Sequence, residues 1–494
     1  MELILKNHDY RYAVEQIMLM LFPKERPVYP EGRPSGAFYA VVSLNEGPVW
    51  VTASTALYDR GVRYDGRARV RRDRLENPIV AARLRQRALK LSFYRAGVNC
   101  LGKKPVWGAL SGIRPAMLMR GLLAELPDEN AAKRRFMALY DVSPARTELC
   151  LDAARAALAA EKTLERRDVC LYVGIPFCPT RCAYCSFVSQ SVEKSTGLIP
   201  DFLDALEQDI RATAAAAKAA GLRPVSVYFG GGTPTTLSPE QLDRVLSALA
   251  REFDLSAVRE FTVEAGRPDT ITAEKLAVLR ARGVTRVSVN PQTMSDRVLA
   301  AIGRRHTAAD VLRAIELVRE AGGFQINMDL IAGLPEDTVG GFRETVDRVL
   351  ALGAENVTVH TLALKKGSRI TLEGEGAHLP DGAEVGAMLE YAREKLTARG
   401  YAPYYLYRQK FMSGGYENVG WCRPDTENLY NICVMEELRS VISMGAGAST
   451  KLTVGDGQLR RFFAPKYPRE YIDGIGKVCA DKQQIEDFYE ERGT

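Results

Sequence analysis

The stretch that decides the fold is VGIPFCPTRCAYCSF, residues 173–187, in which a buried strand runs directly into a loop with three cysteines. Val169–Ile175 is rich in the aliphatic residues of a strand that is covered on both faces. Two prolines then break the strand pattern, and Cys178, Cys182 and Cys185 follow at spacings of four and three residues. We therefore expect a loop at the end of a strand on which three thiolates converge.

Three thiolates on one loop suit an iron–sulfur cluster. A [4Fe–4S] cluster normally takes four cysteine ligands. With three, one iron keeps an open position that can chelate the amino and carboxylate groups of S-adenosylmethionine (SAM). Reduction of the sulfonium by one electron would then release a 5′-deoxyadenosyl radical. We therefore predict a [4Fe–4S] cluster held by Cys178, Cys182 and Cys185, with SAM as a second cofactor.

Zinc is the main alternative for these cysteines, because a remote His or Cys could complete a tetrahedral site. The chain has only four histidines, and none of them adjoins the three cysteines. Chance packing of three thiols is a weaker alternative. The nine cysteines of the chain are an odd number with no repeated spacing, which is a poor disulfide framework.

Strand-like runs alternate with helical periodicity over residues 168–370. The predicted strands are Val169–Ile175, Val225–Phe229, Glu260–Glu264, Arg286–Asn290, Gln325–Ile331 and Asn356–Leu362. The predicted helices are Phe202–Ala220, Pro239–Phe253, Ala273–Arg282, Ala308–Ala321 and Gly341–Leu352, of which the second and fourth have capping residues, Ser238 and Thr307, before them. Sequential β/α units form parallel sheets, so we predict an α/β fold, a partial (β/α)6 barrel.

The regions on either side of this barrel have other patterns. Residues 1–165 begin with an amphipathic helix at about 9–22, followed by β-rich segments, and are predicted to be an accessory α+β domain. The barrel domain is assigned to residues 166–375. Residues 376–494 are predicted to form a mainly helical C-terminal domain that covers the substrate site.

Polar or glycine residues follow the predicted strands at their carboxyl ends, where the active sites of barrels lie. They are Gly230-Gly231-Gly232-Thr233, Glu264 with Arg267, Asn290 with Gln292, Asp329, and Gly333-Leu334-Pro335. Consecutive glycines let the backbone approach a ligand closely. Each residue alone could be structural, but their recurrence at successive strand ends favours a shared ligand.

Composition and charge limit the classes of partner that we expect for this chain. A net charge of +6 over 494 residues is too dilute to predict nucleic-acid binding by itself. The arginine-dense stretch Arg60–Arg87 raises the alternative of an RNA-binding face, but Tyr64 is its only aromatic residue and acidic residues interrupt it, so a solvated face is favoured. The first residues lack a secretory pattern, and no apolar run is long enough to cross a membrane; we expect a cytoplasmic protein.

These motifs resemble the radical SAM superfamily and, within it, the oxygen-independent coproporphyrinogen III oxidase family. The matching strings are YVGIPFCPTRCAYCSF, YFGGGTPTTL, FTVEAGRPDT, RVSVNPQTM and INMDLIAGLP, which together cover about residues 170–340. WGALSGIRP (107–115), YLYRQKFMSGGYENVGW (405–421) and LYNICVMEELRSVISMGAGAST (429–450) resemble the longer branch of HemZ-type coproporphyrinogen dehydrogenases.

The resemblance implies roles for individual residues. The positions that match SAM contacts in the family are Tyr172, Tyr184, Gly231, Gly232, Thr233, Glu264, Gln292, Arg304 and Asp329. It implies oxidative decarboxylation of coproporphyrinogen III, fed by a reductant such as flavodoxin or ferredoxin, and we expect Tyr172, Glu264, Arg267 and Arg408 to be the catalytic residues. Cations available for the substrate carboxylates are Arg267, Arg305, Lys365, Lys366, Arg369, Arg408 and Lys410, of which Arg267 and Arg408 are the favoured pair.

Two departures leave alternatives open. The best-defined members of the family carry a histidine at the position of Gly174 and a cysteine at that of Phe187. The related haem chaperones carry a His-Asn-x-x-Tyr-Trp motif near the C-terminal end, where this chain has ENLYN (427–431), without the His and the Trp. A haem chaperone and a methyl-transferring, haem-degrading enzyme therefore remain as alternatives.

Overall fold

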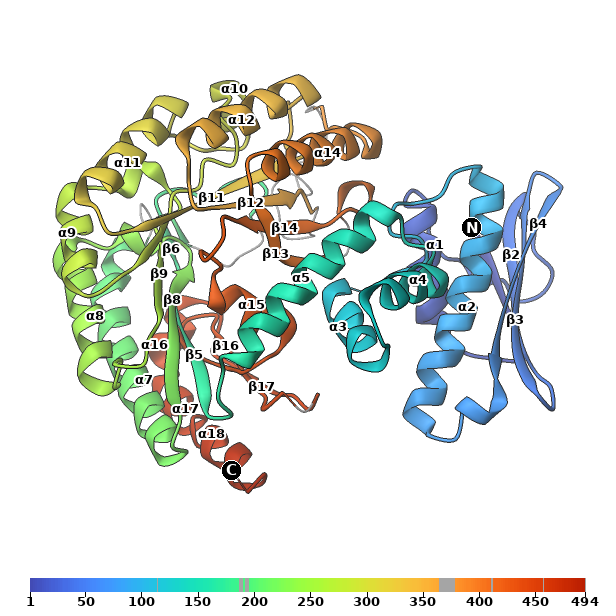
Figure 1. The fold of residues 1–494 in the computed structure, drawn as a ribbon, viewed down its shortest axis with the longest axis horizontal. Coiled ribbons are helices and arrows are strands. Elements are labelled where there is room, and N and C mark those ends of the chain that lie inside the picture. The colour runs from blue at the N-terminus through green and yellow to red at the C-terminus, as the bar shows by residue number, and fades with distance from the viewer. Residues whose placement is uncertain are drawn as a thin grey trace. The chain divides into compact units, whose positions relative to one another are not determined.

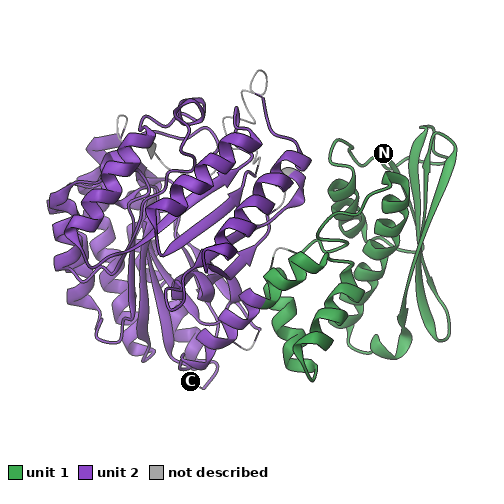
Figure 2. Cartoon of the chain, turned by 45° about the horizontal axis from the view of Figure 1, so that its top comes forward, with its two compact units in different colours: residues 1–151 green, residues 152–494 purple. Residues whose placement is uncertain are grey.

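The structure, a computed structural model, describes residues 1–112, 114–185, 190–191, 195–363, 378–409, 412–455 and 457–493. The chain has two compact units, residues 1–151 and 152–494 (Figure 2). The three-domain division, with boundaries at 165 and 375, stays a prediction. In the described part of the chain, no helix is both long enough and apolar enough to span a bilayer.

Unit 1 is a four-stranded sheet with helices on one face. Its elements are β1 (Glu2–Lys6), α1 (Arg11–Leu21), β2 (Phe38–Glu46), β3 (Trp50–Asp59), β4 (Val62–Arg71), α2 (Pro78–Leu101), α3 (Pro115–Glu125) and α4 (Glu129–Tyr140); α5 (Pro144–Lys162) runs from unit 1 into unit 2. The strand order is β1-β2-β3-β4, and α2 packs on β3 and β4. Apolar residues alternate along β2, β3 and β4, so one face of the sheet is buried in a core with α1 and α2.

Unit 2 contains the predicted β/α units (Figure 1). Its parallel strands are β5 (Asp168–Ile175), β8 (Arg223–Gly231), β9 (Glu260–Glu264), β10 (Arg286–Ser288), β11 (Gln325–Ala332) and β12 (Asn356–Thr361). The helices between them are α7 (Ile199–Ala219), α8 (Pro239–Glu252), α9 (Ala273–Ala281), α10 (Asp296–Ala301), α11 (Ala308–Ala321) and α12 (Val339–Leu352). Capping boxes at Ser238 and Thr307 begin α8 and α11, as their sequence signals predict.

The C-terminal region carries the predicted helices and also extends the sheet at both ends. Its elements are α14 (Gly382–Ala398), β13 (Ala402–Tyr407), β14 (Asn418–Cys422), α15 (Leu429–Glu436), β15 (Ser440–Gly445), β16 (Ser449–Leu452), β17 (Arg460–Phe463), α16 (Pro468–Asp473), α17 (Ile475–Ala480) and α18 (Gln483–Glu490). The result is an open eleven-stranded sheet in the order β13-β14-β12-β11-β10-β9-β8-β5-β15-β16-β17. The partial barrel is confirmed, and these five added strands are a feature that the sequence did not reveal.

Strand β15 joins the sheet beside β5 and is held there by a buried ion pair. The two strands are parallel, with Gly445 in register with Gly174. The Asp209 carboxylate on α7 accepts hydrogen bonds from the Gly445 amide at 3.0 Å and the Tyr471 hydroxyl at 2.8 Å. The ammonium of Lys482 lies 2.6 Å from Asp209. Because every charge here has partners, this cluster ties the C-terminal helices to the barrel.

Candidate cofactor site

The cysteine loop follows β5 and lies against two buried arginines. Cys182 is 8% exposed, and Arg267 directs one nitrogen to its Sγ at 3.4 Å and the other to the Thr180 hydroxyl at 2.7 Å. Burial alone would raise the pKa of the Cys182 thiol, but the charges of Arg304 and Arg267 outweigh burial and lower this pKa. The thiolate, which is the metal-binding form of cysteine, is therefore favoured.

The loop suits a metal cluster through its donors rather than through a preformed cage. On this loop the described residues end at Cys185. Among the described residues of the chain, no three His, Cys, Asp or Glu side chains lie close enough together to bind a metal ion as they stand. The chemistry of the donors fits an anionic cluster, since thiols stand beside guanidinium groups that offset negative charge. Short β6 (Phe177–Cys178) places the first thiol, and it pairs with β7 (Gln190–Ser191).

The glycine-rich end of β8 packs directly on the start of this loop. Gly231 has a φ of 109°, and a Cβ on Gly232 would stand 2.4 Å from the carbonyl oxygen of Phe177. The Thr233 amide donates to that same carbonyl at 2.7 Å, and the Thr233 hydroxyl lies 3.5 Å from Cys178 Sγ. Only glycine allows so close an approach. The predicted glycine contacts and the first cysteine are therefore neighbours.

Arg304 connects the loop to the end of β10. Its guanidinium donates to the Asn290 carbonyl at 2.6 Å and to the Tyr184 hydroxyl at 3.1 Å. Because Arg304 is only 8% exposed and Tyr184 lies between two cluster cysteines in sequence, these contacts fix the far side of the loop. Two residues predicted from the family pattern are thus in direct contact.

Gln292 is held in a conformation that few non-glycine residues adopt. Its φ is 68°, and it pairs with β11 on both sides: its amide donates to the Asp329 carbonyl at 2.9 Å, and its carbonyl accepts from Ile331 at 3.0 Å. A left-handed non-glycine residue costs on the order of 1–3 kcal/mol, and such strain recurs at ligand sites. The conformation places Gln292 and Asp329 side by side at the carboxyl ends of β10 and β11.

Glu264 is the acid of the site whose pKa is raised towards neutral pH. The Tyr228 hydroxyl donates to its Oε1 at 2.6 Å. Burial raises the pKa of Glu264 to about 7; the bond from Tyr228 opposes this rise, and the negative charge of Asp329 adds to it. A carboxyl group with this pKa changes its protonation near neutral pH, as groups at functional sites often do.

The pKa of Asp329, in contrast, is lowered. Burial would raise its pKa, but His360, whose Nε2 lies 3.7 Å from Oδ2, and Asn327, which donates to Oδ1 at 2.8 Å, lower it. The site therefore holds an ionised Asp329 close to a Glu264 that is half protonated near neutrality.

The remaining predicted residues are placed as follows. Tyr228 and Tyr430 stack with ring centroids 4.4 Å apart, and Tyr172 packs beside this pair, 6.3 and 6.1 Å away. Arg408 follows β13, is 8% exposed and donates to the Gly415 carbonyl at 2.7 Å. Arg305 is exposed. Lys365, Lys366, Arg369 and Lys410 lie outside the described residues, as does Phe187.

Sequence reasoning missed Tyr228, His360 and Tyr430. Tyr228 and His360 lie on β8 and β12 and face the same side as Glu264 and Asp329, so the two-residue alternation of a strand could have indicated them. Tyr430 had no such signal. It reaches the site because α15 packs on β8, β13 and β15, which only the folded chain shows.

Known proteins match this arrangement. Residues 172–349 match the radical SAM superfamily. The chain is 38% identical over 390 residues to the oxygen-independent coproporphyrinogen-III oxidase-like protein HemZ from Bacillus subtilis, covering 78% of each chain. It is 35% identical over 250 residues to the haem chaperone HemW of the same organism, covering 50% of this chain and 64% of HemW.

A solved structure agrees. Coproporphyrinogen III oxidase (HemN) from Escherichia coli, a radical SAM enzyme, superposes with a TM-score of 0.53 and 26% identity, covering 66% of this chain and 73% of HemN. Members of the superfamily bind a [4Fe–4S] cluster and SAM, so these are the cofactors of this chain. With its cysteine loop, strand-end residues and relatives in agreement, the chain belongs to the radical SAM superfamily and, within it, to the oxygen-independent coproporphyrinogen III oxidase family of the HemZ type.

Proposed function

We propose that this chain is a radical SAM oxidoreductase that decarboxylates two propionate side chains of coproporphyrinogen III to vinyl groups, giving protoporphyrinogen IX. The observation that carries the proposal is the 38% identity to HemZ over 78% of both chains, which extends well beyond the matched radical SAM region. The likeness to HemN, whose name gives this substrate, supports the same substrate class.

In this proposal Cys178, Cys182 and Cys185 would hold the [4Fe–4S] cluster. The lowered pKa of the Cys182 thiol and the contact between Thr233 and Cys178 support this assignment. SAM would contact the strand-end residues, which are Tyr172, Tyr184, Gly231, Gly232, Thr233, Glu264, Gln292, Arg304 and Asp329. When bound, the two cofactors supply a 5′-deoxyadenosyl radical for hydrogen abstraction.

The side chains would orient and protect this chemistry. Asp329, held ionised by His360 and Asn327, would attract the cationic part of SAM. Glu264 can hold or release a proton at its carboxyl oxygens near pH 7. The half-buried rings of Tyr172, Tyr228 and Tyr430 would limit the access of water to the inner side of the site.

Each conversion must balance. One propionate loses one hydrogen atom, one electron and CO2 and becomes a vinyl group; the hydrogen atom ends on 5′-deoxyadenosine and the electron passes to an acceptor. A one-electron donor such as flavodoxin or ferredoxin would supply one electron for each SAM consumed. Arg408 and Arg267 are the proposed partners of substrate carboxylates, although Arg267 already donates hydrogen bonds to the cysteine loop and to Asp269. A cytoplasmic location remains part of the proposal.

A haem chaperone is the second candidate, favoured by the 35% identity to HemW. One contact speaks against it. Asn428, in the segment where the chaperones carry their haem motif, caps α15 through its Oδ1 and donates to the Thr262 hydroxyl at 3.1 Å. This segment therefore holds α15 against the sheet.

The test is anaerobic reconstitution of the full chain with iron, sulfide, SAM, a chemical reductant and coproporphyrinogen III, followed by mass analysis. We expect loss of two CO2 per substrate, with one 5′-deoxyadenosine for each. Stoichiometric haem binding without substrate-dependent SAM cleavage would instead identify a chaperone. S-adenosylhomocysteine or a methylated tetrapyrrole would identify the methyl-transferring alternative.

A further inference from the structure

The positive charge of the chain is concentrated in unit 1. Residues 1–151 contain 25 lysines and arginines against 15 aspartates and glutamates, a net charge of +10, whereas residues 152–494 carry 42 against 46, a net charge of −4. Nineteen of the 25 cations in unit 1 are arginines. Such an asymmetry between two parts of a chain points to an anionic partner for the basic part.

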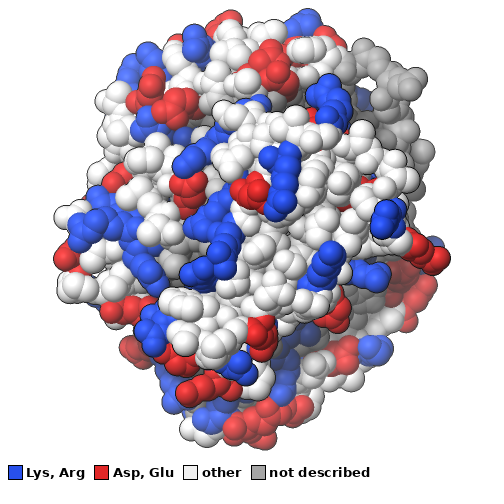
Figure 3. Space-filling model, turned by 90° about the vertical axis from the view of Figure 1, so that its right-hand side faces the viewer, with Lys and Arg blue, Asp and Glu red and all other residues white. Residues whose placement is uncertain are grey.

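Part of this charge lies on the sheet face opposite α2. Along β4, buried Gly66, Ala68 and Val70 alternate with exposed Arg67, Arg69 and Arg71. Among the described residues no acidic side chain pairs with Arg67 or Arg69, while Arg71 pairs with the exposed Asp73. Figure 3 looks onto this side of the molecule and shows Lys and Arg side chains across its middle, with Asp and Glu side chains among them.

The neighbouring strands add aromatic and hydroxyl groups to the same face. In register, Ser54 of β3 lies opposite Arg67, Thr52 opposite Arg69 and Trp50 opposite Arg71. Trp50 is 41% exposed. Near the other end of β3 and β2, Tyr58 and Tyr39 stack with ring centroids 4.6 Å apart. Sequence reasoning found only one aromatic residue in the arginine stretch, because these come from adjacent strands.

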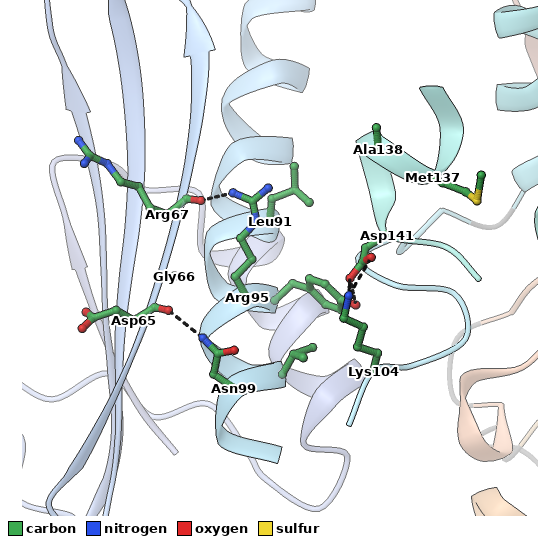
Figure 4. Close-up of a pocket in the computed structure, with 12 residues that line it drawn as sticks. Asp65, Gly66, Arg67, Leu91, Arg95, Asn99, Lys104, Met137, Ala138 and Asp141 are labelled. Atoms are coloured by element: carbon green, nitrogen blue, oxygen red, sulfur yellow. Dashed lines mark hydrogen bonds and ion pairs between the residues drawn. The ribbon is translucent and has the colours of Figure 1, made fainter. Parts of the chain in front are cut away.

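Two carbonyls at the outer edge of β4 are already bonded to α2, so a partner is expected on the face rather than at this edge. From α2, Arg95 donates to the Arg67 carbonyl and Asn99 to the Asp65 carbonyl at 3.3 Å, which blocks strand addition here (Figure 4). A pocket of about 480 Å³ lies beside this edge, but Lys104, one of its lining cations, is neutralised by Asp141 at 2.9 Å. In Figure 4 the Arg67 side chain points away from α2, to the other side of the sheet.

We propose that this face of β2, β3 and β4 binds single-stranded RNA. Outward residues on a strand are about 6.8 Å apart, so the arginine row can follow an extended phosphodiester backbone, and guanidinium groups pair with phosphate through two hydrogen bonds. The serine and threonine hydroxyls can contact 2′-hydroxyl groups, and Trp50 offers an exposed ring to a base.

The test measures binding of the full chain to a labelled single-stranded RNA of about 20 nucleotides by fluorescence anisotropy, across about 50–200 mM salt. The double variant Arg67→Gln/Arg69→Gln should weaken binding at least tenfold and reduce the salt slope by about 1.4, because two phosphate contacts are lost. The matched control is Arg134→Gln/Arg135→Gln, which removes two exposed arginines from α4 and should change affinity less than threefold.

A second readout reports contact with the face directly. The chain has three tryptophans, and Trp107 and Trp421 are buried, so Trp50 is the exposed one. RNA should quench tryptophan emission, and Trp50→Phe should keep the affinity within threefold while losing the quenching. No binding at the lowest salt, equal weakening by both arginine pairs, or a quench that persists in Trp50→Phe would overturn the proposal. So would equally tight binding of polyglutamate, which would indicate an acidic protein partner, or of single-stranded DNA.

Discussion

Glu260 and Glu264 stand four residues apart on β9 and therefore face the same side of the sheet, but they do different things. Glu260, at the amino end, accepts hydrogen bonds from two backbone amides at the start of α15, at 2.9 and 3.2 Å, and lies 3.6 Å from Arg286. Glu264, at the carboxyl end, accepts hydrogen bonds from the Tyr228 hydroxyl at 2.6 Å and from the Gly231 backbone amide.

Burial raises the pKa of both carboxyl groups, and their partners make the difference. At Glu260 the charge of Arg286 and the α15 amides oppose the rise, so the carboxylate serves as an anchor for the helix. At Glu264 the charge of Asp329 adds to burial, and the pKa reaches about 7. One strand thus carries a structural acid at one end and a chemically responsive acid at the other.

The largest effect is expected when one of the three loop cysteines is replaced, a change that leaves the contacts of Glu260 intact. Replacing Cys178, Cys182 or Cys185 by alanine should abolish the visible absorbance of the reconstituted cluster and all SAM cleavage, because one ligand of three is lost. Cys100→Ala, in unit 1, is the matched control and should keep both. A variant of the three that retains a full cluster would disprove the ligand assignment.

The anchor end is tested by Arg286→Met, which leaves Glu260 buried without its charge partner. We expect a loss of about 3–5 kcal/mol in the free energy of unfolding, measured by denaturant titration of the cluster-free protein. Arg282→Met, which breaks the exposed pair with Asp243, should cost less than about 1 kcal/mol. Glu260→Gln combined with Arg286→Met should restore part of the loss, because no charge then remains buried.

The raised pKa of Glu264 is tested by comparing how the stability of the protein and of the Glu264→Gln variant depends on pH. The folded protein protonates Glu264 more readily than the unfolded chain, whose Glu pKa is about 4.5, so stability should fall as pH rises from about 4.5 to about 7 and level off above. Glutamine removes this fall, which we expect to be about 1–3 kcal/mol in denaturant titrations across that range. If the variant keeps the same pH profile, Glu264 does not have a raised pKa.

The smallest effect sharpens the role of Tyr228. Tyr228→Phe removes the hydrogen bond that favours the Glu264 carboxylate, so the midpoint of the pH profile should move upward by less than about one unit, equivalent to roughly 1 kcal/mol. Tyr430→Phe retains the ring stacked at 4.4 Å and should leave the midpoint in place. An equal shift in both variants would assign the effect to packing.

Much of the β/α core could be predicted because its signals are local. Glu260–Glu264 and Ala308–Ala321 were predicted with the bounds that the structure has, and the cysteine spacing was sufficient to indicate the cofactor class. What the sequence could not show depends on distant pairing. Ser440–Gly445 has the pattern of a buried strand, but nothing in it specifies β5 as its neighbour. Tyr430 reaches the site only because α15 packs on the strands of the assembled sheet.

The pairing of β15 with β5 has a consequence for synthesis on the ribosome. About 270 residues separate Ile175 from Gly445. At 5–20 residues per second, Gly445 is therefore synthesised roughly 14–54 s after Ile175, and during this time one edge of β5 lacks its neighbour β15. The cysteine loop emerges next to that waiting edge. A cluster loaded before β15 has paired would therefore stand beside a strand edge that is still uncovered.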